Sequence, residues 1–123
     1  MKTPNVNALS DSDLMAQFRQ HALDMSEVLL DSNIRAENRL VDKMKAIDDE
    51  LRRRGSSARK ALLVLLNDED LRVRYEAARR SLAVDRDIAL KVLREVQASH
   101  YMPVAAEAGL TLSHLEQGIF KPT

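Results

Sequence analysis

Four arginines lie within one stretch of largely apolar sequence, LLVLLNDEDLRVRYEAARRSL at 62–82. Guanidinium groups at this density either contact the phosphates of a nucleic acid or project outward from a packed helix. The same stretch holds ten Leu, Val or Ala residues and no recognisable catalytic motif. We therefore interpret it as a packing unit that carries its charges outward.

The helical phase of residues 70–84 divides these arginines into two groups. The apolar stripe consists of Leu71, Tyr75, Ala78 and Leu82. At ~100° per residue, Arg74 lies about 40° from Ala78 and inside the apolar arc, so it needs an acceptor, and we expect a structural pair with Asp68. The opposite arc holds the residues that we predict to contact a partner, namely Arg72, Glu76, Arg79 and Arg80.

The chain contains histidines and carboxylates, but their spacing fits neither a metal site nor acid–base catalysis. The histidines His21, His100 and His114 do not form a metal-binding motif. The acidic run DDE at 48–50 points in three directions on a helix, which favours an exposed turn over a metal site. The chain has no cysteine and no glycine-rich phosphate loop. We expect no catalytic residue, no metal and no cofactor; an enzyme whose site is shared across a homodimer ranks third among the functions considered.

The densest basic run is LRRRGSSARK at 51–60. It suits phosphate contacts, because a helix end followed by a loop with Arg, Ser and Lys can neutralise several charges. It equally suits a helix C-terminus, where cations complement the dipole. The chain has only four aromatic residues, too few for a platform that stacks bases. We favour the structural interpretation and keep nucleic-acid binding as the alternative.

Composition places the 123 residues in the all-α class. Apolar residues make up 45% and charged residues 31%, which is typical of a globular chain, and the length predicts one domain over 1–123. Three glycines, three prolines and four aromatics are few for a β-protein. Formal net charge is zero, but residues 51–99 carry an excess of basic groups. Acidic residues interrupt that excess, so it argues only weakly for a polyanionic partner.

Apolar spacing and helix-end signals predict six helices. Two N-terminal helices occupy 10–54, the first capped by Ser10 or Ser12 and the second running from Ile34 to a stop at Gly55. Two helical hairpins follow at 57–84 and 86–117, built from segments at 57–66, 70–84, 86–99 and 103–117. Residues 118–123 form a tail, in which we expect Ile119 and Phe120 to fold back onto the core.

A shift of thirty residues superimposes the two hairpins. Leu62, Leu63 and Leu66 then fall on Val92, Leu93 and Val96, and Ala78 falls on Ala108. The first hairpin resembles a HEAT-type repeat through its leucines, its Asp-containing turn at Asp68, and the Val73-Arg74 pair. The second departs from that pattern, with Ala98 in place of the Asp. The resemblance implies a HEAT/armadillo-like right-handed α-α superhelix.

The whole chain is also similar to a small bacterial family of domains of unknown function, number two thousand and nineteen. The strings that carry this similarity are ENRLVDKMKAIDDELRRRG, LRVRYEAARRSLAV and AGLTLSHLEQGIFKPT. The family has no established activity, so the similarity implies a fold and leaves the function open.

These observations favour a non-enzymatic binding module whose partner is another protein. An adaptor and an immunity-type inhibitor both fit, as do a monomer and a homodimer. The start of the chain lacks the apolar core of a signal peptide, and no apolar run reaches membrane-spanning length. We therefore expect a cytoplasmic protein that does not contact a membrane.

Overall fold

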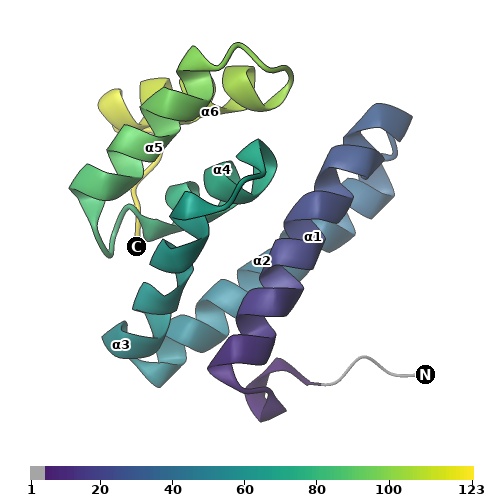
Figure 1. The fold of residues 1–123 in the computed structure, drawn as a ribbon, viewed down its shortest axis with the longest axis vertical. Coiled ribbons are helices and arrows are strands. Elements are labelled where there is room, and N and C mark those ends of the chain that lie inside the picture. The colour runs from purple at the N-terminus through teal and green to yellow at the C-terminus, as the bar shows by residue number, and fades with distance from the viewer. Residues whose placement is uncertain (1–4) are drawn as a thin grey trace. The chain divides into compact units, whose positions relative to one another are not determined.

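A computed structural model describes residues 5–123, and these residues form helices and loops without any β-strand. The expected all-α class with six α-helices is confirmed. Figure 1 shows α1 (Asp11–Asp31), α2 (Ile34–Arg54), α3 (Ser56–Arg59), α4 (Leu71–Ser81), α5 (Arg86–Ala98) and α6 (Val104–Glu116). Two 3-10 helices, Val6–Ala8 and Lys60–Asn67, complete the secondary structure of the described residues.

The chain divides into two compact units, an N-terminal unit that ends at Ala61 and a C-terminal unit of Leu62–Thr123. The single domain expected over 1–123 stays a prediction.

In the N-terminal unit, α1 and α2 pack side by side as a helical hairpin (Figure 1). Ser10 caps α1 by accepting a hydrogen bond from the Asp13 amide, and Asn33 caps α2 in the same way through Ala36. The left-handed backbone of Ser32 makes the sharp reversal between them. The buried apolar side chains recur at steps of three and four, as expected for one face of a helix: Leu14, Phe18, Ala22 and Met25 on α1, and Leu40, Met44, Ile47 and Leu51 on α2.

The segment after α2 differs from the helix expected at 57–66. Gly55, at φ 115°, ends α2 where a residue with a side chain would be strained. The chain then makes the single α-helical turn of α3 and continues as the 3-10 helix Lys60–Asn67. Residues three apart share a face in a 3-10 helix, and Leu62 and Leu65 are both buried here. A spacing of three also fits an α-helix, so the sequence could not distinguish the two forms.

In the C-terminal unit, α4 packs against both α5 and α6, which also pack against each other. Asp70 and Asp85 cap α4 and α5 by accepting hydrogen bonds from the Val73 and Ile88 amides. Small residues allow the close packing of the three helices, since Ala77, Ala78, Ala89, Ala105 and Ala108 are all buried. Each of the three helices therefore packs against the other two, and this packing influences which arginines of α4 reach solvent.

Candidate functional site

Arg72 and Glu76 are buried on α4, so the outward orientation expected for them is wrong. Their side chains are only 3% and 6% exposed. The guanidinium of Arg72 donates two hydrogen bonds to the Glu107 carboxylate on α6, and one of them, to Oε1, is 3.0 Å long. It also lies 3.4 Å from Oε2 of Glu76. The Arg72–Glu107 pair joins α4 to α6, while the predicted contact of Arg72 and Glu76 with a partner stays untested.

Arg80 extends the same cluster on α4. Its Nη1 donates to Oε1 of Glu76 at 2.9 Å and to the Glu76 carbonyl at 3.0 Å, and its side chain is 10% exposed. Arg80 is therefore also engaged inside the unit. The physical reason is that α5 and α6 both pack on α4 and Glu107 of α6 pairs with Arg72, so part of the arc opposite the main apolar stripe is packed as well.

The Arg72 guanidinium also stacks on an aromatic ring. It lies over Tyr75 at 5.5 Å from the ring centre, and its Nε has no hydrogen-bond partner. The Tyr75 hydroxyl is 2.9 Å from Oγ1 of Thr111 on α6. Burial raises the pKa of that hydroxyl, so Tyr75 remains neutral and serves as a packing residue.

Arg74 and Asp68 come together as the sequence suggested, through a main-chain acceptor. Nε of Arg74 donates to the Asp68 carbonyl oxygen, while the Asp68 carboxylate accepts from the Asp70 amide at 2.9 Å. The contact joins the start of α4 to the preceding turn. Its role as a structural pair stays a prediction that stability measurements can test.

Arg79 is half-buried, and its guanidinium lies 5.5 Å from the centre of the Phe120 ring. The amides of Ile119 and Phe120 both donate to the His114 carbonyl, which turns the tail back at the end of α6. Phe120 is half-buried, whereas Ile119 is 65% exposed. Arg79 thus contacts the tail of its own chain, and its predicted contact with a partner remains untested.

The basic run at 51–60 is engaged within the N-terminal unit. Arg54 donates to Asp11 Oδ1 at 2.7 Å and to the main-chain carbonyl of Leu9 at 2.6 Å, while Arg53 and Arg54 both bind Glu50. Hydrogen bonds from the two arginines lower the pKa of Glu50 to about 2. Arg59 lies 3.5 Å from Asp48, in the acidic run. These contacts support the structural interpretation of the run.

The α1–α2 hairpin carries a shallow groove of about 310 Å³ lined by residues of both charges, including Asp24, Arg39 and Lys43. His21 lies nearby on α1. Burial lowers its pKa, Lys43 lowers it further, and Asp24 opposes the shift. A neutral, half-buried histidine flanked by opposite charges is consistent with a packed helix surface.

A larger groove of about 460 Å³ runs between α5 and α6, and no sequence pattern pointed to it. Leu90, Leu112 and Leu115 are half-buried along it. Arg86 and Arg94 line it from α5; both are exposed, and within the described chain their side chains make no ion pair or hydrogen bond. The groove therefore offers an apolar wall beside two uncommitted cations.

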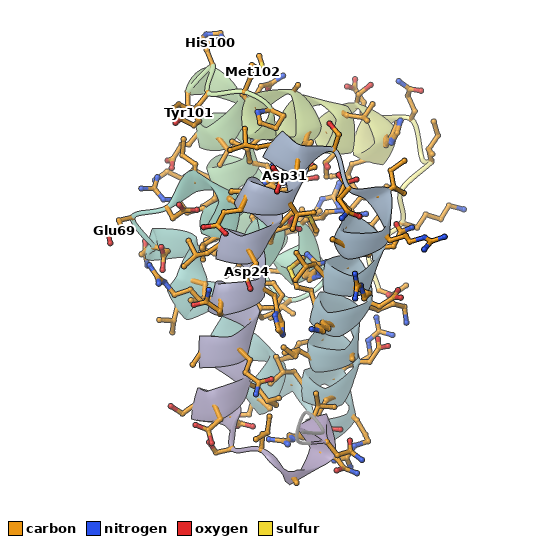
Figure 2. All side chains as sticks on the ribbon, turned by 90° about the vertical axis from the view of Figure 1, so that its right-hand side faces the viewer. Asp24, Asp31, Glu69, His100, Tyr101 and Met102 are labelled. Atoms are coloured by element: carbon orange, nitrogen blue, oxygen red, sulfur yellow. The ribbon has the colours of Figure 1, made fainter. Side chains whose placement is uncertain are left out.

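The loop that joins α5 to α6 adds exposed apolar surface to the same hairpin. His100, Tyr101 and Met102 project from it, as Figure 2 shows. Tyr101 is 70% exposed and Met102 is 62% exposed. His100 adopts a positive φ of 56°, which turns the chain sharply at this point.

Residues 5–123 contain no group of three or more His, Asp or Glu side chains that could hold a metal ion. Over the same range, no helix is long and apolar enough to cross a membrane.

The fold and its sites describe an all-α protein whose charged clusters lie mostly within its own helical packing. The chain belongs to the family named Domain of unknown function (DUF2019), whose model matches residues 12–116. It is also similar to the protein RPA1889 from Rhodopseudomonas palustris, known from a crystal structure, with 34% sequence identity and a TM-score of 0.90. That match covers 98% of this chain and 100% of the other. No curated protein matches the chain. The family similarity read from the sequence is confirmed, while the HEAT-type resemblance stays a prediction.

Proposed function

We propose that the protein is a non-enzymatic binding module whose partner is another protein. The observation that carries the proposal is the α5/α6 groove, in which half-buried leucines lie beside charged residues that have no partner within the described chain. Grooves between helices that combine an apolar floor with a few polar groups are common binding sites for protein segments. An adaptor and an immunity-type inhibitor both require such a surface.

The exposed apolar residues of the same hairpin support a protein partner. Tyr101 and Met102 project from its loop, while Ile88 on α5 and Leu110 on α6 are 47% and 56% exposed. Large apolar groups exposed on the α5–α6 hairpin favour association with another protein surface. Aromatic residues and methionine are also enriched where proteins bind each other.

Nucleic-acid binding through the arginine-rich centre is the less favoured function. Arg72, Arg74 and Arg80 all donate hydrogen bonds to acceptors within the C-terminal unit. Their guanidinium groups are therefore already engaged in the absence of a nucleic acid. A nucleic-acid partner would have to displace these contacts or use other cations. The engagement of these arginines therefore favours a protein partner over a nucleic-acid partner.

The repeat pattern adds a proposal about architecture. We infer a HEAT/armadillo-like superhelix from the thirty-residue repeat, because hairpins with an alanine-rich second helix stack against similar neighbours. A superhelix of this kind binds partners through the exposed faces of successive helices.

The test is to purify the tagged full-length protein from its native host and measure its mass by size exclusion with light scattering. We expect a complex with one other protein at fixed stoichiometry. Duplex DNA should bind weakly, and that binding should fall steeply as salt is added. Retention of nucleic acid at physiological salt, without any stoichiometric protein, would show that the proposed function is wrong.

A further inference from the structure

We infer that the α5/α6 groove binds an amphipathic helix of the partner, and that this helix presents two carboxylates beside its apolar face. The inference rests on the proposed function, because it names the segment of the partner protein that is recognised. It is drawn from the spacing, exposure and free charge of the residues that line the groove.

Arg86, Leu90 and Arg94 follow one another at steps of four on α5. Residues four apart lie on the same helix face, so cation, leucine and cation form one row along the groove. A rise of 1.5 Å per residue places the two arginine backbones about 12 Å apart. The row continues to Gln97, and α6 contributes Leu112 and Leu115.

The charges of Arg86 and Arg94 contribute nothing to the packing of the C-terminal unit. Arg72 and Arg80 are held by carboxylates, whereas neither groove arginine has an acceptor within the described residues. Arg86 is also the first residue of α5, where the helix dipole disfavours a cation. Both groups are therefore free to pair with an anion.

The charge of the groove selects an acidic occupant. Among the described residues that line it, Glu116 is acidic while Arg86 and Arg94 are basic, which leaves an excess positive charge. A carboxylate can accept two parallel hydrogen bonds from each guanidinium. Acidic residues seven or eight positions apart on a partner helix match the ~12 Å separation.

The leucines favour a helix over a nucleic-acid backbone. A phosphate backbone gains nothing from Leu90, Leu112 and Leu115, which need apolar groups against them. An amphipathic helix supplies such groups at i, i+3, i+4 and i+7, the usual pattern for a helix bound in a groove. A partner helix of this kind uses the leucines and the arginines at once.

The experiment uses a labelled helical peptide of roughly 18 residues, a length of about 27 Å that spans the groove. Its leucines stand at positions 5, 8, 9 and 12, its glutamates at positions 6 and 13, which lie beside the leucine face, and alanine or glutamine elsewhere. A matched peptide carries lysine in place of both glutamates. Fluorescence anisotropy reports binding of each peptide to the full-length protein.

We expect the acidic peptide to bind the natural protein at least tenfold more tightly than the basic peptide. Arg94→Glu should weaken acidic-peptide binding at least tenfold, and the double variant Arg86→Glu/Arg94→Glu should reverse the preference and bind the basic peptide better. Lys91→Glu is the matched control, because Lys91 is exposed on α5 and does not line the groove. It makes the same charge change and should alter binding less than about threefold.

Four results would overturn the inference. One is failure of the acidic peptide to bind at a concentration of about 1 mM, well above typical affinities for a specific segment. Another is an equal loss of binding in Lys91→Glu and Arg94→Glu. A third is binding of duplex DNA in place of the peptide, with this binding lost in the Arg94→Glu variant. The fourth is a homodimer that Arg94→Glu dissociates, which would assign the groove to a second copy of this chain.

The outcomes separate this inference from the proposed function. If a stoichiometric protein partner still binds the double variant, the α5/α6 groove is not its binding site, but the protein-binding function remains. A chain that binds the acidic peptide but has no protein partner in its host would count against the proposed function alone.

Discussion

At the scale of single residues, Arg72 and Arg94 carry the same guanidinium group in opposite surroundings. Arg72 is enclosed by Glu76, Glu107 and the Tyr75 ring, whereas Arg94 is exposed beside the groove. A buried cation requires its acceptors, because taking a charge out of water is costly unless partners replace the lost hydration. The two positions therefore differ in what their replacement does to stability.

Arg72→Ala should lower the free energy of unfolding by about 3 kcal/mol, since it leaves the buried Glu76 carboxylate with fewer donors and opens a gap beside Tyr75. Chemical unfolding followed by circular dichroism measures the loss. Arg94→Ala is the control, because its side chain is exposed and makes no polar contact in the described chain. It should change stability by less than about 0.5 kcal/mol. Equal effects of the two substitutions would contradict the buried cluster.

Glu50 makes the N-terminal unit sensitive to acid. Its pKa falls from an ordinary value of 4.5 to about 2 because Arg53 and Arg54 bind the ionised carboxylate. The unfolded chain takes up the proton near pH 4.5, while the folded chain resists it until about pH 2. The stabilisation from this carboxylate is therefore complete above pH 4.5, the ordinary pKa, and is lost as the pH falls through the folded-state pKa of about 2.

Glu50→Gln should accordingly destabilise the protein at pH 7, and the difference from the natural protein should shrink as the pH falls from about 5 towards 2. Urea unfolding at a series of pH values measures that difference. Glu37→Gln is the control, because Glu37 makes no ion pair within the described residues. If the difference in the free energy of unfolding between the natural protein and Glu50→Gln does not change with pH, the arginines do not hold the carboxylate ionised.

At the scale of helices and loops, the placement of α4 explains why its charges were misassigned. A helical wheel with one apolar stripe implies one buried side, but α5 and α6 both pack on α4. The arc opposite the stripe holds Arg72, which pairs with Glu107 of α6, and Glu76 and Arg80, which pair with each other. Polar residues on a wheel do not reveal this, because the same letters describe an exposed arc and a buried ionic cluster.

The tail after α6 is held by a contact between elements. Phe120→Ala should lower the free energy of unfolding by about 1.5 kcal/mol, less than the 3–5 kcal/mol typical of a fully buried ring, because Phe120 is half-buried. A double-mutant cycle with Arg79→Ala should give a coupling of about 0.5 kcal/mol from the ring and the guanidinium. Ile119→Ala, at an exposed position, serves as the control. A coupling energy of zero between Phe120 and Arg79 would show that the tail is not held against α4 by this contact.

At the scale of the whole chain, capping signals and apolar spacing predicted five of the six expected helices, whereas the helix expected at 57–66 is a single α-helical turn followed by a 3-10 helix. Ser10 caps α1 and Gly55 ends α2 as expected, and Asn33, Asp70 and Asp85 cap the helices that follow them. These features were readable because each depends on a few neighbouring residues. The α5/α6 groove was not readable, because it depends on how residues of two helices face each other. Side chains such as Leu90 and Leu112 look like ordinary core positions in sequence.

The burial of α4 by its two neighbours predicts how the chain responds to truncation. In a fragment of residues 1–85, α5 and α6 are missing, and α4 loses the two helices that pack against it in the C-terminal unit. Arg72 loses Glu107 and Tyr75 loses Thr111 in the same step. A helix of 11 residues is marginal in water without tertiary packing, so residues 71–81 should unfold.

Hydrogen exchange on the fragment and on the full-length chain measures this directly. We expect the amides of residues 71–81 to be protected in the full-length chain and to exchange at unfolded rates in the fragment. A second fragment, residues 1–98, retains α5 but still lacks α6, and it should restore only part of the protection, because α5 packs on α4 while the Arg72–Glu107 and Tyr75–Thr111 contacts require α6. Full protection of α4 in the 1–85 fragment would mean that α5 and α6 are not what keeps it folded, and the buried cluster would then be a consequence of the fold rather than one of its supports.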